Sequence, residues 1–161
     1  MLLVTPSAHR YQQSTLTASM RPSVGLSGNH IALRIRPHTD EAKRRALMET
    51  WYRDQLKQAV PPLLEKWESR VGAAINGFSV RRMKTKWGSC SPASGTIRLN
   101  TDLAKKPQEC LEYVVVHELV HMLESNHGLD FVAHLDRLMP SWQSLRDRLN
   151  QLPLPHEDWS Y

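Results

Sequence analysis

Apolar and polar residues alternate in two stretches of this 161-residue chain. In residues 30–36 the apolar side chains fall on one side, which predicts a strand. Residues 78–100 also alternate, but the phase shifts at Arg81-Arg82, which indicates a bulge, and residues 91–95 have the composition of a turn. We therefore expect residues 78–100 to form a β-hairpin.

Residues 39–72 carry apolar positions at the three- and four-residue spacing of a helix. Thr39 is placed to cap this segment, and acidic residues follow it, as suits a first turn. Proline removes a backbone donor from a helix interior, so we expect Pro61-Pro62 to end one helix and to open another. Gly72 is the type of residue that commonly ends a helix.

A further helical pattern begins at Pro107 and is apolar over most of its surface, which predicts a buried helix. We expect this helix to end near Glu124, because Ser125-Asn126 favours a turn that folds the chain back. Two short amphipathic helices follow it, one on either side of Pro140.

The distribution of these patterns predicts one domain of α+β class, in which a small β-sheet packs against a central helix and its flanking helices. Residues 1–29 are rich in Ser, Thr, Gly and Gln without a sustained period, which predicts a poorly ordered N-terminal arm. We expect the domain to occupy residues 30–150 and residues 151–161 to form a C-terminal tail.

The buried helix contains the motif His117-Glu118-Leu119-Val120-His121. Histidines four residues apart project from one helix face, and this spacing suits two imidazole ligands of one zinc ion. Glu118 lies between them, where it reaches water beside the metal without binding the metal itself, as a general base requires. Polar groups in a buried helix need partners, so a metal centre is favoured over two core histidines and a salt-bridged glutamate.

His127 is the best candidate for a third ligand, because the turn after the helix returns it toward the first two. Distant carboxylates are the alternatives: Asp136, Asp147 or Glu157. Three histidines leave a fourth position open, as in catalytic zinc sites. Cys90 and Cys110 lack Cys-x-x-Cys spacing, which argues against a closed structural site.

Several stretches carry a family resemblance in combination: Arg82-Met83-Lys84-Thr85-Lys86-Trp87-Gly88-Ser89-Cys90-Ser91, Gly95-Thr96-Ile97-Arg98-Leu99-Asn100, Tyr113 to His121, Asn126-His127, Phe131 and Leu138-Met139-Pro140-x-Trp142. Over roughly residues 31–150 the chain resembles the YgjP-like family of bacterial metallopeptidases. The resemblance implies a zincin fold related to SprT-like peptidases. It also implies that His117, His121 and His127 bind metal and that Glu118 is catalytic.

Together these features predict a zinc-dependent hydrolase, and specifically a peptidase; another divalent transition metal would suit the same ligands. The strand Thr96–Asn100 is a candidate edge for an extended peptide. The candidate substrate contacts are Trp87, Ser89, Arg98, Asn100 and Tyr113. Core packing is the competing explanation for Trp87 and Tyr113.

The net charge of +5 permits an anionic partner. Six basic residues precede the helix that carries the histidine motif: Arg70, Arg81, Arg82, Lys84, Lys86 and Arg98. They suggest two alternatives, a metal-dependent nucleotide phosphohydrolase of pyrophosphatase type and a non-catalytic nucleic-acid-associated metal-binding module. A Gly-rich phosphate loop is absent from the sequence, and a structural site has no use for Glu118. Neither a membrane span nor a signal peptide is evident, so we expect a cytoplasmic protein without membrane contact; the oligomeric state is left open.

Overall fold

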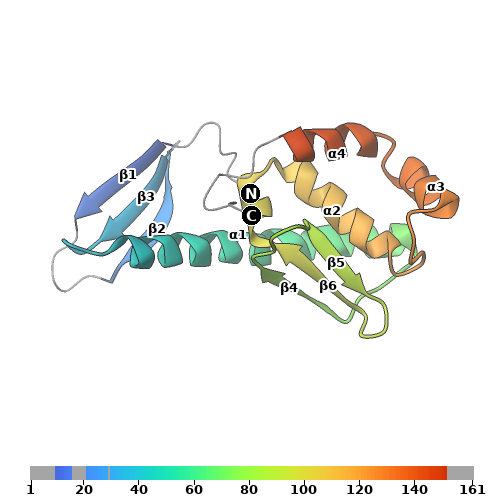
Figure 1. The fold of residues 1–161 in the computed structure, drawn as a ribbon, viewed down its shortest axis with the longest axis horizontal. Coiled ribbons are helices and arrows are strands. Elements are labelled where there is room, and N and C mark those ends of the chain that lie inside the picture. The colour runs from blue at the N-terminus through green and yellow to red at the C-terminus, as the bar shows by residue number, and fades with distance from the viewer. Residues whose placement is uncertain (1–9, 16–20, 29, 152–161) are drawn as a thin grey trace.

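The computed structural model of the chain describes residues 10–15, 21–28 and 30–151. One long helix, α1 (Glu41–Val71), runs through the molecule, with a three-stranded sheet beside each of its halves (Figure 1). The remaining helices lie along its second half, together with the second sheet. The predicted α+β class is confirmed.

The first sheet has the strand order β1-β3-β2 and consists of β1 (Arg10–Thr15), β2 (Ser23–Ser27) and β3 (His30–Ile35). β1 pairs with β3 in parallel and β2 pairs with it in antiparallel fashion. The predicted poorly ordered arm is therefore wrong for β1 and β2. A central strand needs partners for its backbone groups on both edges, and a polar segment supplies them without an apolar pattern of its own.

Helix α1 continues through Pro61-Pro62 without a break, so the predicted division into two helices is wrong. Each proline in a helix interior costs about 3 kcal/mol. One continuous buried stripe offsets this cost, because each large apolar side chain contributes about 1.5–3 kcal/mol on burial. The stripe consists of Tyr52, Leu56, Val60, Leu63, Trp67 and Val71. Asp40, and not Thr39, caps the helix through the Lys43 N–H, while Gly72 ends it in the left-handed conformation as predicted.

The second sheet has the order β4-β6-β5 and consists of β4 (Gly77–Arg81), β5 (Gly88–Ser91) and β6 (Thr96–Asn100). β5 and β6 form an antiparallel hairpin, but β4 pairs with the far edge of β6 in parallel. The predicted hairpin is thus confirmed only from residue 88 onward. Residues 82–87 carry the chain across the sheet, which accounts for the phase shift that we assigned to a bulge.

A short 3-10 helix, η1 (Thr101–Lys105), leads from β6 to α2 (Gln108–Val120). α2 ends four residues before the predicted position, and a tighter turn follows in which Leu123 N–H donates to the Val120 carbonyl at 2.9 Å. α3 (Leu129–Leu138) and α4 (Trp142–Gln151) complete the structure. Residues 152–161, which hold most of the predicted tail, lie outside the described residues.

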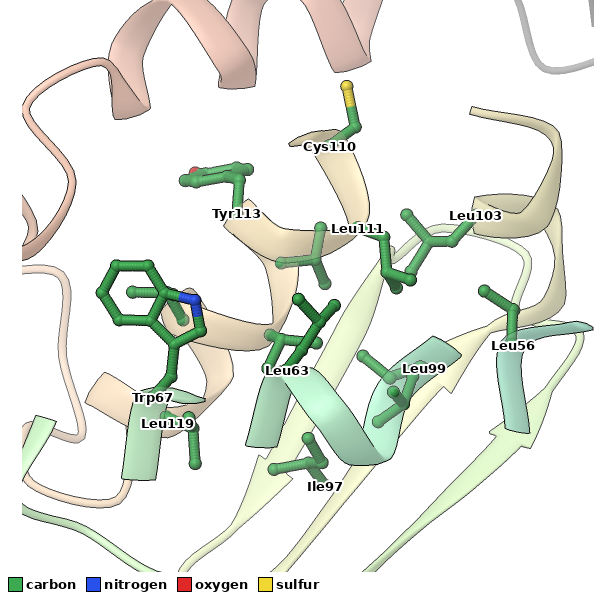
Figure 2. Packing of buried hydrophobic residues seen from close by; sticks show 14 of the residues in the cluster. Leu56, Leu63, Trp67, Ile97, Leu99, Leu103, Cys110, Leu111, Tyr113 and Leu119 are labelled. Carbon is green, nitrogen blue, oxygen red and sulfur yellow. The ribbon is translucent and has the colours of Figure 1, made fainter. Parts of the chain in front are cut away.

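The core of the second half forms where α1, β6 and α2 meet (Figure 2). Leu56 and Leu63 of α1 pack with Ile97 and Leu99 of β6 and with Leu111 of α2, and all five are buried. This packing fixes α2 against the sheet and thereby sets the motif that it carries beside β5. None of the helices in the described part of the chain has the length and apolar run needed to cross a membrane.

Candidate metal centre

The structure brings His117, His121 and His127 together at the C-terminal end of α2. His127 Nε2 lies 3.0 Å from His121 Nε2 and 3.1 Å from His117 Nε2. Two ligands of a tetrahedral zinc ion, each about 2.0–2.1 Å from the metal, lie about 3.3–3.4 Å apart. Two of the three Nε2 pairs thus lie at nearly the spacing that a small divalent ion needs, and the three ligand atoms all lie within 4.8 Å of one another.

The other ring nitrogens have partners that orient the imidazoles. His121 Nδ1 lies 2.9 Å from the Glu124 carbonyl oxygen, to which it donates, and this leaves Nε2 unprotonated for a metal. The Tyr113 hydroxyl lies 3.4 Å from His117 Nδ1. Phe131 of α3 packs against all three imidazole rings, with ring centroids 4.6–4.9 Å apart.

The protonation state of the histidines also suits metal binding. Burial, together with the neighbouring His121 and His127, lowers the pKa of His117 to about 3. Burial also lowers the pKa of His121. Because a metal binds the neutral imidazole, these shifts favour the metal-binding form of His117 and His121 at neutral pH.

Of the alternative carboxylate ligands, Asp136 and Asp147 do not lie at this centre. Asp136 accepts a hydrogen bond from the Trp142 indole at 2.8 Å, which ties α3 to α4. Asp147 accepts from the adjacent Arg146 guanidinium at 3.0 Å. Glu157 lies outside the described residues.

The Glu118 carboxyl is buried beside the histidines, and its Oε2 atom has no hydrogen-bond partner. Burial raises its pKa to about 7, while the positive charge of Lys86 opposes that rise. An unpartnered buried carboxyl oxygen costs free energy unless the site is completed by another group. Three converging imidazoles and one such carboxyl fit a divalent metal with an associated water.

Gly88, the first residue of β5, holds this carboxyl in place. A methyl group at its Cα would lie 2.4 Å from Glu118 Oε1 and 2.9 Å from Cδ. Gly88 lies within the strand, and the need for glycine at this position comes from the close approach of Glu118. β5 and α2 are thereby packed with the catalytic candidate between them.

A cleft of about 580 Å³ opens over the histidines and Glu118. Of the predicted substrate contacts, Trp87, Ser89 and Tyr113 line the cleft. Arg98 and Asn100 do not line it. Asn100 is buried instead, and its amide donates to the carbonyls of Met83 and Lys86 at 2.8 and 2.9 Å. It therefore shapes the crossing segment 82–87, which leads into the cleft wall.

Arg146 of α4 lines the cleft, although sequence analysis did not select it. Its guanidinium lies 5.2 Å from the centre of the Trp142 ring, and its charge lowers the pKa of Tyr113 against the larger effect of burial, which raises that pKa. The amphipathic pattern after Pro140 predicted this helix but gave no sign that Arg146 reaches the cleft.

Comparison with known proteins agrees with this geometry. The chain is similar to the zymogen of abylysin, a metallopeptidase of Pyrococcus abyssi, with 25% identity and a TM-score of 0.52 over 56% of this chain and 90% of that one. It also aligns with the zymogen of the metallopeptidase jannalysin of Methanocaldococcus jannaschii, with 25% identity and a TM-score of 0.49 over 56% of this chain and 92% of that one. A comparison with curated proteins gives no match.

The model of the YgjP-like, metallopeptidase domain family matches residues 6–152. The match begins before β1, whereas the resemblance described above spans roughly residues 31–150, so the N-terminal sheet is part of the family's domain. With 25% identity to a structure of the zincin type, the predicted zincin-like fold is confirmed. The chain therefore belongs to the YgjP-like family of metallopeptidases and is a metallohydrolase.

Proposed function

We propose that this enzyme is a zinc-dependent peptidase in which His117, His121 and His127 hold the metal and Glu118 is the general base. The observation that carries the proposal is the convergence of three imidazole Nε2 atoms beside a buried carboxyl oxygen without a partner. Three neutral imidazoles suit zinc, and other divalent transition metals are accepted by the same donors.

When bound, zinc supplies Lewis acidity toward a carbonyl oxygen and toward water. Glu118 takes a proton from the attacking water through Oε2 and passes it to the nitrogen of the leaving amine. Gly88 keeps the carboxyl at the required position, and the Glu124 carbonyl keeps His121 in the tautomer that binds metal. Phe131 excludes water from the back of the imidazoles.

An extended peptide would lie along β5 and not along β6. Both edges of β6 are already paired, by β4 and β5, so the predicted role of Thr96–Asn100 as a substrate-binding edge is wrong. Within the described residues no strand pairs with the outer edge of β5, and Gly88, Ser89 and Cys90 of this strand line the cleft. Strand addition at this edge places the peptide across the histidines.

A metal analysis joined to a peptide-cleavage screen tests the proposal. The purified protein should contain one zinc per chain, and His127→Ala should lower this content sharply. Glu118→Gln should keep the metal but lose at least about 100-fold in turnover, since an amide does not accept the proton. Full metal content in His127→Ala, or full turnover in Glu118→Gln, would remove these residues from their proposed roles.

A nucleotide phosphohydrolase remains the second candidate, because two cations, Lys86 and Arg146, line the cleft. The net charge does not support this function. The residues before Glu49 include seven Lys and Arg and two Asp and Glu, so they account for the whole +5, and the part of the chain that forms the cleft has no net charge. Of the six basic side chains that suggested this function, only Lys86 lines the cleft. Release of phosphate or diphosphate from nucleoside triphosphates by wild type but not by Glu118→Gln, with all peptides left intact, would favour it over the peptidase.

A further inference from the structure

β5 and α2 run side by side in the same direction along the cleft. Gly88 faces Glu118, and two residues later the Cys90 sulfur lies 3.1 Å from that of Met122, four residues further along the helix. Two residues of a strand and four residues of a helix both advance by about 6–7 Å. The residues before β5 therefore approach the N-terminal end of α2.

Lys86 and Trp87 immediately precede β5 and therefore lie toward the N-terminal end of α2. The Trp87 ring lies 5.4 Å from the Lys106 Nζ, and Lys106 stands immediately before the start of α2. Lys86 is exposed and lines the cleft together with Val114, one turn before Glu118. Its ammonium group thus lies at the Tyr113 end of the cleft, on the wall that β5 forms.

Arg146 reaches the same end from the opposite wall. α4 packs against α2, and Arg148 of α4 lies 4.0 Å from Glu109 in the first turn of α2. Arg146 and Asn150, one helical turn apart, both line the cleft with Tyr113. Asp147 pairs with Arg146, but both side chains are exposed, and an exposed pair of neighbours competes weakly with a ligand.

The cleft is thus cationic at one end. Among the described residues that line it, Glu118 is the only carboxyl, and it belongs to the metal centre. Tyr113 lies one helical turn, about 6 Å, before His117. That distance corresponds to one or two residues of extended peptide, at about 3.3 Å each.

We propose that Lys86 and Arg146 form a carboxylate subsite at the Tyr113 end of the cleft, which selects peptides with a carboxylate one or two residues from the cleaved bond. The inference rests on the proposed peptidase function and names its substrate class. The carboxylate has two possible sources, an Asp or Glu side chain and a free C-terminus. Charge-assisted hydrogen bonds from Lys and Arg, with the Tyr113 hydroxyl beside them, are the interactions that recognise it.

The test begins with digestion of a mixed peptide library by zinc-loaded wild type, with cleavage sites read by mass spectrometry. The best-cleaved sequence is then made in matched pairs, Glu against Gln near the bond and free against amidated C-terminus. We expect the carboxylate form to be preferred by about tenfold to a hundredfold in kcat/KM, since hydrogen bonds to charged groups are the stronger ones. The pair that shows the preference identifies the source.

Variants assign the preference to residues. Lys86→Gln with Arg146→Gln should bring the ratio close to one, whereas Arg148→Gln, on the same helix but not lining the cleft, should retain it. Fluorescently labelled versions of the matched peptides should bind to Glu118→Gln without turnover. Their Kd values, measured by anisotropy, should show the same preference for the carboxylate form. Cleavage by wild type without a carboxylate preference, or a preference that survives the double substitution, overturns the inference but leaves the peptidase function standing. If no peptide is cleaved, the proposed function falls and the subsite falls with it.

Discussion

Replacing Gly88 with alanine should disable catalysis while leaving the metal ligands in place. The added methyl carbon would lie 2.4 Å from Glu118 Oε1, and ordinary contact begins at 3.4 Å, so the carboxyl must move by about 1 Å. Misplacement of a reacting group by 1 Å costs about 100-fold in rate, and loss of a general base costs about 100- to 10,000-fold. We therefore expect kcat/KM of Gly88→Ala to fall by about 100-fold or more.

The same crowding should lower the free energy of unfolding by about 1–3 kcal/mol, as overpacking does elsewhere. Gly77→Ala is a matched control, because Gly77 also begins a strand of this sheet and an added methyl group meets no atom within 4 Å. The assay is kcat/KM on a cleaved peptide, with zinc content measured on the same samples. Wild-type turnover in Gly88→Ala at full zinc content would refute the assignment of Gly88 as the residue that positions Glu118. Equal losses in both glycine variants would refute it as well.

Three other perturbations follow from the structure. In the metal-free protein, the raised pKa of Glu118, about 7 against 4.5 in the unfolded chain, makes a stability contribution that is present below pH 4.5 and lost as the pH rises through 7. Glu118→Gln removes this titration, so its stability relative to wild type should rise between pH 4.5 and 8 by up to about 3 kcal/mol, measured by urea unfolding; a difference that does not change with pH would contradict it. Asn100→Asp places a carboxylate against the Met83 and Lys86 carbonyls and should destabilise the protein by about 1–3 kcal/mol, whereas Arg98→Gln on the same strand should be nearly neutral in the same assay. Deleting residues 1–29 removes both neighbours of β3 and should expose Ile31 and Ile35. The truncated protein should then bind more of a hydrophobic dye and melt at a lower temperature. An unchanged melting curve would argue against the sheet.

The metal centre was predictable because its chemistry is local in the sequence. His117 and His121 are set by helix geometry alone, and His127 needs only a short turn to reach them. The structure brings all three together as that reasoning requires. Their roles as ligands stay predictions until a metal is measured.

The failures arose where long-range packing overrides local signals. Pro61-Pro62 is a strong local break, but the buried stripe on both sides of it needs one straight helix. The parallel pairing of β4 with β6 joins residues about twenty apart, and alternation alone does not distinguish it from a hairpin. β1 and β2 were missed because their backbone pairing with β3, which leaves no local mark in the sequence, is what completes this sheet.

For the same reason, the residues of the cleft walls were harder to predict than the histidines and Glu118. Arg146 and Tyr113 are far apart in sequence, and only the packing of α4 on α2 places them together. Asn100 looked like a substrate contact because polar residues at strand ends often are. Its burial and its four hydrogen-bonded partners, the Met83 N–H and carbonyl, the Lys86 carbonyl and the Asp102 N–H, show a structural role.

Burial tunes the charge of the whole centre. It keeps His117 uncharged at neutral pH and favours the protonated form of Glu118 below about pH 7. A divalent cation beside Glu118 favours its ionised form, the form that accepts a proton from water. In the proposed mechanism a bound metal would therefore raise the fraction of Glu118 that can act as a base, and the charge of Lys86 favours ionisation in the same direction from the cleft wall. Burial of Glu118 would thus link metal occupancy to the protonation state that hydrolysis needs.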